Sequence, residues 1–222
     1  MTNNQYNATI TEAAYLANIP DREIRRIIED EILSTAFINM RKDRCFNLAA
    51  CVLASFYFKS SEYLYKKCRI LVIKKLLEKI PHLAEVSDSE VFRLQSENDE
   101  TWKIHIEELS IDLGVFAQPT IERFEMLHQV VSLEKIMDGE PILLGTRVPA
   151  RTISFLVSNG ISYKEIIEQY PSIPNYELFQ SAKIWSDLNL YRLAPKKIAD
   201  IPAEWKLIST IKVKFKKYEI FN

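Results

Sequence analysis

The stretch from Asp138 to Tyr170 constrains the fold more than any other part of the chain, because it holds three of the protein's four glycines. A chain this poor in glycine uses the residue where the backbone must turn. The pattern predicts two turns around a short apolar strand, followed by two helices. These features are a turn at Asp138-Gly139, a strand over Ile142–Leu144, a turn at Gly145-Thr146, and helices on either side of Gly160.

Capping residues mark the ends of these two helices. Asn159-Gly160 is a good C-cap for the first helix. Ser162 to Glu165 fits a capping box that opens the second helix, and Tyr170-Pro171 ends it, since proline disfavours a helical residue before it.

A third helix is predicted from Asn175 to about Leu190. Residues 130–190 would then form a trihelical unit. The segment that opens this unit contains no acid/base pair, nucleophile or metal cluster, so it is predicted to be a binding module and not an enzyme. The inward positions of the third helix are Leu178, Ala182, Trp185 and Leu188.

Composition limits the classes of protein that the chain can belong to. Its 222 residues are enough for two or three compact units. No apolar run approaches the roughly 20 residues that cross a bilayer, and the first residues do not fit a secretory signal. We therefore expect a cytoplasmic protein without cofactor or metal, with buried free thiols at Cys45, Cys51 and Cys68 and scattered histidines at His82, His105 and His128.

Charge is unevenly distributed along the chain. Residues 59–79 carry seven basic and two acidic side chains, residues 85–112 carry nine acidic and two basic, and residues 192–219 carry eight basic and three acidic. Such a pattern allows one face to meet phosphates while another meets protein. The alternative is that these charges only keep the surface soluble.

The first 31 residues are typical of two short helices joined by a tight turn. A capping box at Thr9–Glu12 opens the first helix, and Asn18–Pro20 forms the turn. The second helix has an apolar stripe at helical spacing, with three arginines mostly on its other faces. This order indicates a helix-turn-helix whose candidate DNA contacts are Arg22, Arg25 and Arg26. The alternative is that these arginines pair with Glu29, Asp30 and Glu31 on the same helix.

A hairpin and two further helices are predicted after the helix pair. Thr35–Asn47 reads as two short strands joined by a basic tip, whose candidate contacts are Arg41, Lys42 and Arg44. The tip would touch the DNA backbone or minor groove as a wing, or would be an ordinary solvated turn. Leu48–Phe58 is then a hydrophobic helix, and Ser61 to about Lys79 is a long basic one with an apolar stripe at Leu64, Cys68, Leu71, Val72 and Leu76.

Alternation of apolar and polar residues over residues 91–116 predicts a small antiparallel β-meander with one buried face. His105 would lie on its polar side. Residues 120–133 are expected to form a connector. The apolar residues of the three runs are Phe92 and Leu94; Trp102, Ile104 and Ile106; and Ile111, Leu113 and Val115.

The tail alternates apolar and basic residues over Ile211–Lys217, which predicts a strand. It would add to the sheet edge of a partner or cover the partner's active site. The alternative is a charged edge strand that resists aggregation. The candidate residues are Lys212, Lys214, Phe215, Lys216 and Lys217.

Two parts of the chain resemble known families. Residues 6–80, with helix-turn-helix, basic hairpin and long helix in order, look like the MerR-type winged helix-turn-helix. Residues 130–190 resemble a trihelical domain long catalogued as of unknown function, whose members are regarded as VapB-type antitoxins encoded beside PIN-domain-like ribonuclease toxins. The matching positions of this second resemblance are Gly139, Pro141, Gly145, Thr146, Arg147, Pro149, Gly160, Tyr170 and Pro171.

The chain departs from the antitoxin pattern at Glu140 and Leu144, where basic residues are usual. We therefore expect weak nucleic-acid contact at that hairpin. Arg147 follows a glycine turn and precedes a proline, so it would brace local structure by binding Asp138, Glu140 or helix carbonyls, or else meet a partner. Core or interface packing is expected of the tryptophans, Trp102, Trp185 and Trp205.

Together these observations predict an α+β protein with four segments: a winged helix-turn-helix over 1–83, a β-meander and connector over 84–129, a trihelical domain over 130–190, and a basic tail over 191–222. The resemblance implies the antitoxin of a type II toxin–antitoxin pair. It would bind a PIN-like ribonuclease and, as a homodimer, double-stranded operator DNA. The alternatives are a MerR-like regulator without a toxin, and a protein-interaction module that does not bind DNA.

Overall fold

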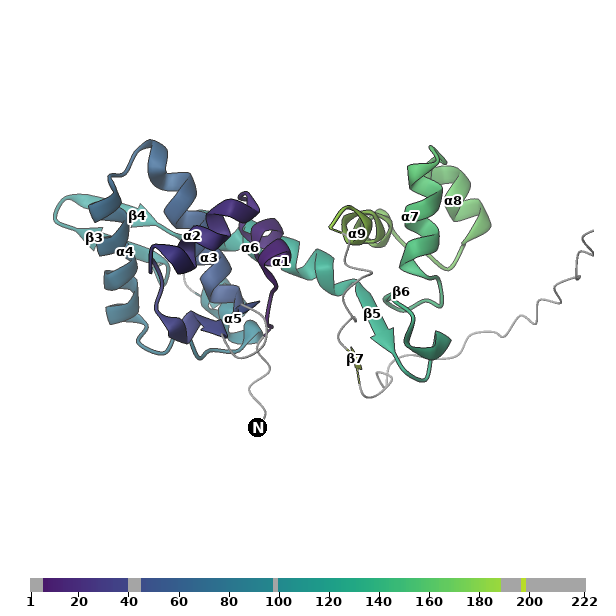
Figure 1. Cartoon of the computed structure of the whole chain (residues 1–222), viewed down its shortest axis with the longest axis horizontal. Helices are drawn as coiled ribbons and strands as arrows, with labels where there is room; N and C mark the ends of the chain where they lie inside the picture. Colours follow the sequence, from purple (N-terminus) through teal and green to yellow (C-terminus); the bar gives the residue numbers. More distant parts are fainter. Residues whose placement is uncertain (1–5, 40–44, 98–99, 189–196, 199–222) are drawn as a thin grey trace, which may run out of the picture.

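The computed structural model describes residues 6–39, 45–97, 100–188 and 197–198. It is an α+β structure in which helices dominate and the sheets are small (Figure 1). The helices are α1 (Ile10–Ala17), α2 (Asp21–Glu29), α3 (Leu48–Lys59), α4 (Lys66–Lys79), α5 (Asp88–Glu97), α6 (Gly114–His128), α7 (Ala150–Ser158), α8 (Tyr163–Gln169) and α9 (Tyr176–Asp187). The strands are β1 (Ile38–Asn39), β2 (Cys45–Phe46), β3 (Lys103–Ile106), β4 (Leu109–Asp112), β5 (Val130–Leu133), β6 (Ile142–Leu143) and β7 (Lys197–Ile198).

The elements form two lobes that α6 connects (Figure 1). The first lobe contains α1 to α5 and the pairs β1–β2 and β3–β4, and the second contains β5 to β7 and α7 to α9. α6 packs on α1 and α3 in the first lobe and on α9 in the second. Within the described residues, no helix is both long and apolar enough to cross a membrane.

Helix α3 is the centre of the first lobe. Every residue of α3 except Lys59 is buried, because α1, α2, α4, α5 and α6 all pack around it. Asn47 caps the helix by accepting a hydrogen bond from the Ala50 amide at 2.8 Å, and its side-chain amide donates to the Ala84 carbonyl at 2.8 Å. One buried polar side chain therefore both starts the helix and fixes the chain that leads into α5.

Two parts of the predicted β-meander are helical. Residues 88–97 form α5, where Val91 is buried, and the third predicted strand ends early because α6 begins at Gly114. The prediction was wrong because a short apolar run fits either period. Within the predicted meander, the described strands are β3 and β4, which form an antiparallel pair over residues 103–112. His105 is exposed there, as predicted.

The predicted connector at 120–133 is also wrong, since it is mostly the second half of α6. The buried positions of α6 repeat at helical spacing: Phe116, Ala117, Thr120, Ile121, Phe124 and Leu127. Pro119 lies inside the helix and conceals it in the sequence, because proline normally interrupts a helix. The Thr120 hydroxyl and the Arg123 guanidinium each donate to a carbonyl four residues back, at 2.8 and 3.0 Å.

Smaller differences concern the hairpin and α4. Residues 35–37 form a short 3-10 helix where a strand was predicted, so the described hairpin is limited to Ile38–Asn39 and Cys45–Phe46. The helix predicted from Ser61 begins at Lys66, after a second 3-10 turn, η2 (Ser60–Glu62). The predicted apolar stripe is right at Val72 and Leu76 but wrong at Leu71, which is 40% exposed.

The second lobe agrees with the predicted order of turns, strand and helices. β5 pairs antiparallel with β6 and parallel with β7. Ser162 and Glu165 form the predicted capping box of α8, and Asn175 caps α9. α9 packs on α7, β5 and β6, with Leu178, Ala182 and Trp185 buried as predicted.

Candidate nucleic-acid interface

The helices α1 and α2 form a tight pair at the surface of the first lobe. Thr9 caps α1 in a reciprocal capping box with Glu12, as predicted. Asn18 ends α1 in the left-handed conformation (φ 53°), and Pro20 precedes α2. The Thr11 hydroxyl donates to the Asp21 carboxylate at 3.3 Å. The turn between the helices is therefore short and fixed at both ends.

Helix α2 buries one face and exposes the other. Ile24 and Ile27 have no exposed surface, and α2 packs on α1 and α3. The three predicted arginines are all exposed. Because two isoleucines fix the inner side of the helix, the arginines of its outer side are available to a phosphate or to the edge of a base. These side chains are Arg22, Arg25 and Arg26.

Arg26 is the most constrained of the three. Its Cζ atom lies 5.6 Å from the centroid of the Phe58 ring, and its Nη2 atom lies 3.5 Å from Asp30 Oδ2. The alternative prediction, that an arginine of α2 pairs with a carboxylate of the same helix, is therefore right for Arg26. Neither Arg22 nor Arg25 has an ion-pair partner among the described residues. The outer side of α2 therefore keeps two arginines without an ion pair to a described residue and one, Arg26, that is partly engaged.

A lysine ends α3, directly after the ring that lies under Arg26. Phe58, which lies under Arg26, is followed by Lys59. Partial burial, and then the nearby Arg123 guanidinium, lower the pKa of the Lys59 amine. Both effects disfavour the charged form of the lysine.

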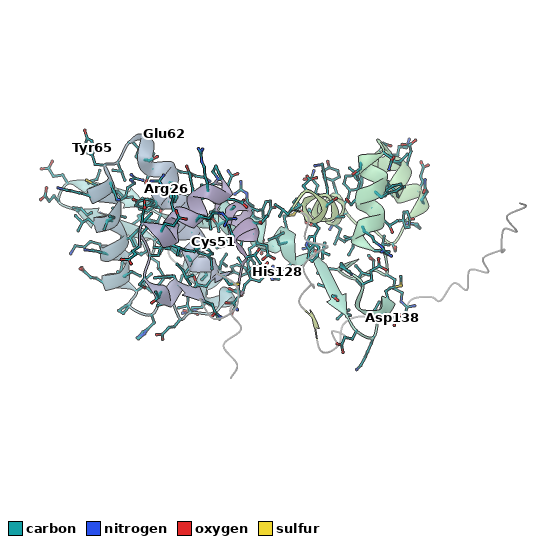
Figure 2. The ribbon with its side chains drawn as sticks, in the orientation of Figure 1. Arg26, Cys51, Glu62, Tyr65, His128 and Asp138 are labelled. Atoms are coloured by element: carbon teal, nitrogen blue, oxygen red, sulfur yellow. The ribbon has the colours of Figure 1, made fainter. Side chains whose placement is uncertain are left out.

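A second group of exposed residues follows directly along the chain. The Ser61 hydroxyl donates to the Phe58 carbonyl at 2.6 Å, and two tyrosines then project into solvent, Tyr63 at 65% and Tyr65 at 86% exposure. Lys66 and Lys67, which begin α4, are also exposed. Figure 2 shows Tyr65 at the outer edge of the first lobe, in the same part of the molecule as Arg26 and Glu62.

This group was not singled out in the sequence. The signal available there was two tyrosines at a spacing of two, followed by two lysines. That signal becomes informative only when exposure is known, because tyrosine is more often partly buried. Basic side chains beside exposed aromatic rings are typical of nucleic-acid surfaces.

The other predicted contacts lie outside the described residues. The base of the hairpin is described, and Ala8 adds to it through an antiparallel bridge with Phe46. Its tip, with Arg41, Lys42 and Arg44, falls in the undescribed segment 40–44. The tail residues Lys212, Lys214, Phe215, Lys216 and Lys217, together with Trp205, lie in the undescribed segment 199–222.

A buried polar cluster lies where the N-terminal segment enters the first lobe. The Tyr6 hydroxyl donates to the Glu12 carboxylate, and the Tyr6 amide donates to Asp88 Oδ2 at 2.6 Å. The Tyr6 ring packs edge-on against Phe124 and His128. Burial raises the pKa of the Tyr6 hydroxyl, with Glu12 adding to the effect. A tyrosine held protonated in this way anchors the chain and does not supply a reactive group.

Cys51 is close to the same carboxylates and is completely buried. Burial raises the pKa of its thiol, and then Glu12 and Asp88 raise it further. Because the thiolate is the nucleophile, this thiol is poorly suited to catalysis. None of the three cysteines is in a disulfide, as predicted, but the prediction that they are buried holds only for Cys51, since Cys45 and Cys68 are partly buried.

The glycine signature of the second lobe serves its backbone. Gly139, Gly145 and Gly160 have φ of 81°, 75° and 79°, which is the left-handed region that glycine adopts at little cost. The Thr146 hydroxyl donates to the Leu143 carbonyl at 2.9 Å and accepts from the Val148 amide at 3.0 Å. Pro149 then precedes α7 as its N-cap. Gly145, Thr146 and Pro149 therefore turn the chain from β6 into α7, while Gly139 precedes β6 and Gly160 follows α7.

Glu140 forms an ion pair with Arg151, not with Arg147, which lies exposed. The predicted bracing contact of Arg147 with Glu140 is therefore wrong, because Arg151 on α7 occupies that carboxylate. The exposed surface of α9 has mixed charge, since Lys183 pairs with Asp187 at 2.5 Å. The packing of α9 against α6, α7, β5 and β6 also leaves it little surface for a groove of DNA.

The two tryptophans that the structure describes serve packing. Trp102 and Trp185 are buried, as predicted. Among the described residues, no group of three or more His, Cys, Asp or Glu side chains is arranged to hold a metal ion.

Residues 130–181 match the family model described as "Protein of unknown function (DUF433)". A protein described as "Uncharacterized protein y4eO", from Sinorhizobium fredii, is 29% identical over 207 residues, which cover 91% of this chain and 90% of that protein. No solved structure matches the chain significantly. The chain is thus similar to the DUF433 family across β5 to the middle of α9, and to the Sinorhizobium protein across both lobes.

Proposed function

We propose that the protein is the antitoxin of a type II toxin–antitoxin pair. It neutralises a PIN-domain-like ribonuclease and binds its own promoter DNA as a dimer. The observation that carries the DNA-binding part is the exposure of Arg22 and Arg25 on α2, the second helix of a tight pair, without ion-pair partners in the described part of the chain.

The surface of the first lobe supports this proposal in two ways. The arginines of α2 are placed to contact base edges or phosphates, as the second helix of a helix-turn-helix does. Tyr63, Tyr65, Lys66 and Lys67 then extend the surface with hydroxyl and ammonium donors for the phosphate backbone. A single short helix covers only a half-site, so two copies of the chain would share one operator.

The toxin-binding part of the proposal comes from the resemblance of the second lobe to VapB-type antitoxins. The positions from Gly139 to Pro149 form the turn before β6, and the hydrogen-bonded turn between β6 and α7. They position helices and do not contact DNA in this proposal. The second lobe is then free to bind a protein while the first binds the operator.

The DNA-binding part is tested with promoter DNA and the purified full-length protein. We expect the wild type to shift the promoter in an electrophoretic assay, and the double variant Arg22→Ala/Arg25→Ala to lose that shift. The control is Lys164→Ala/Lys183→Ala, which removes the same charge from exposed positions of the second lobe. A wild type that does not shift its promoter, with or without the ribonuclease, would overturn promoter binding.

The toxin-binding part needs a separate experiment. We expect the ribonuclease encoded beside this gene to co-purify with the wild type and to be inhibited by it. Arg22→Ala/Arg25→Ala should retain this inhibition, because its substitutions lie in the other lobe. The proposal fails if the neighbouring gene does not encode such a ribonuclease, or if the two proteins do not associate.

A protein-interaction module that does not bind DNA is the second candidate. The observation in its favour is that Arg26 is already engaged by Phe58 and Asp30. Ribonuclease inhibition by a wild type that never binds promoter DNA would select this alternative.

A further inference from the structure

The outward side of α7 carries an unusual group of exposed residues. Phe155, in the second half of the helix, is 67% exposed. Arg151 lies one turn before it with 71% of its side chain exposed, and Arg147 is exposed just before the helix. We call these three residues the outer α7 face.

Phe155 is exposed because it lies on the side of α7 that faces away from the buried residues of the helix. Ala150, Ile153 and Ser154 are buried, and Phe155 lies on the other side of α7. The aromatic rings of α8 and α9 contact one another instead: Tyr163 lies 5.0 Å from Tyr176, which is 49% exposed, and 5.2 Å from Phe179, between ring centroids. A single exposed apolar residue is ordinary, but phenylalanine together with arginine is the composition of a protein interface.

The outer α7 face has a net positive charge. Residues 150–158 contain no carboxylate. Glu140 neutralises Arg151 in part, and its own side chain is only 19% exposed, so little of its charge reaches the surface. Arg147 has no ion-pair partner within the residues described. A complementary surface would therefore supply carboxylates around an apolar contact for the phenyl ring.

We propose that the outer α7 face binds an acidic surface of a protein partner, with Phe155 in an apolar depression between carboxylates that face Arg147 and Arg151. This inference rests on the proposed function, in which the partner is the PIN-domain-like ribonuclease. It assigns the contact to the second lobe and to α7, whereas the sequence offered the tail, Lys212–Lys217, as the toxin-binding candidate and a partner contact as one alternative for Arg147.

Other occupants fit this face less well. The tail of the chain is basic, with eight basic and three acidic residues over 192–219, so it would meet the arginines with like charge. A symmetric contact between two copies would place the same arginines against one another. A phosphate backbone would pair with the arginines but would leave Phe155 without an apolar partner.

The position of the face is compatible with binding at both lobes. α7 and α2 lie in different lobes, at opposite sides of α6 (Figure 1). A protein bound on α7 would therefore not cover Arg22 and Arg25. The same molecule of antitoxin is then able to hold the ribonuclease and the operator together.

The test measures ribonuclease binding by full-length variants with isothermal titration calorimetry. Phe155→Ser and Arg147→Glu should each weaken binding at least about tenfold, as truncation of an interface anchor does. The controls make matched changes elsewhere: Val115→Ser, at a site that is 61% exposed on α6, and Lys164→Glu on α8. Circular dichroism and thermal melting of each variant show whether it is folded.

Each outcome separates this inference from the proposed function. If the wild type does not bind the ribonuclease, the proposed function itself fails. If the wild type binds and folded Phe155→Ser and Arg147→Glu bind equally well, the outer α7 face is not the contact. If these variants keep the ribonuclease but lose promoter DNA, the face meets nucleic acid and the inference is overturned. Weakened ribonuclease binding with unchanged promoter binding supports it.

Discussion

Trp185 donates a hydrogen bond from its indole Nε1 atom to the carbonyl oxygen of Leu127 at 3.1 Å. Trp185 lies on α9 and Leu127 in the last turn of α6, so this bond joins the second lobe to the connecting helix. The carbonyl groups of a helix end lack partners within the helix. A buried side chain that satisfies one of them ties the second lobe to α6.

Replacing this tryptophan by phenylalanine keeps most of the apolar contact but removes the donor. The Leu127 carbonyl is then left unsatisfied in a buried place. We expect Trp185→Phe to lower the free energy of unfolding by about 1–3 kcal/mol, the usual cost of such a group. Urea denaturation followed by circular dichroism measures this change.

Trp185→Ala serves as the comparison, since it also removes the ring and should cost about 3–5 kcal/mol. Equal stability of Trp185→Phe and the wild type would show that the hydrogen bond contributes nothing. A variant that unfolds in two separate steps would show that the lobes had lost their coupling.

Features that depend on neighbouring residues could be predicted from the sequence. Thr9 with Glu12, and Ser162 with Glu165, are capping boxes in the structure because both partners lie three residues apart. The turns at Gly139, Gly145 and Gly160 follow from the backbone freedom of one residue type. These local rules gave the helix pair α1–α2 and most of the second lobe.

Features that depend on distant contacts could not be predicted. α6 was missed because Pro119 interrupts its helical pattern of apolar residues. Buried residues nevertheless lie on both sides of the proline, such as Phe116 before it and Leu127 after it. The contact between Arg26 and Phe58 joins residues from different helices, so the sequence left the role of Arg26 open. The outward placement of Phe155 and Tyr65 likewise depends on which helix face the rest of the fold covers.

Arg26 and Arg22 should respond differently to truncation, although both lie on α2. A cation over an aromatic ring at an exposed site contributes about 0.5–1 kcal/mol, and an exposed i,i+4 ion pair about 0.3–0.5 kcal/mol. We therefore expect Arg26→Ala to lower the free energy of unfolding by about 1 kcal/mol. Arg22→Ala has neither contact to lose, so its stability should stay within about 0.5 kcal/mol of the wild type.

Chemical denaturation measures both variants, and promoter binding provides the second readout. The proposed surface predicts that Arg22→Ala weakens promoter binding without a loss of stability. Phe58→Leu removes the ring under Arg26 and tests the contact from its other side. The interpretation of Arg26 as a partly structural residue is wrong if Arg26→Ala is as stable as Arg22→Ala.

Cys51 makes the stability of the protein depend on pH in the alkaline range. Burial, with Glu12 and Asp88 nearby, raises the pKa of its thiol in the folded state. In the unfolded chain a cysteine ionises with a pKa of about 8.5. The folded state therefore holds a proton that the unfolded state releases. The stability that the protonated Cys51 thiol contributes is fully present below the pKa of a cysteine in the unfolded chain. It is lost as pH rises toward the higher pKa that this thiol has in the folded state.

We expect the free energy of unfolding to fall steadily as pH increases above about 8.5, the ordinary pKa of the thiol. Cys51→Ala removes the group and should flatten this dependence between about pH 8.5 and 10, before tyrosines such as Tyr6 begin to ionise in the unfolded chain. Cys68→Ala, at a thiol that is only partly buried, is the control and should keep the slope of the wild type. Urea denaturation at a series of pH values under reducing conditions gives the slopes. Identical slopes for the wild type and Cys51→Ala would show that burial of this thiol does not control alkaline stability.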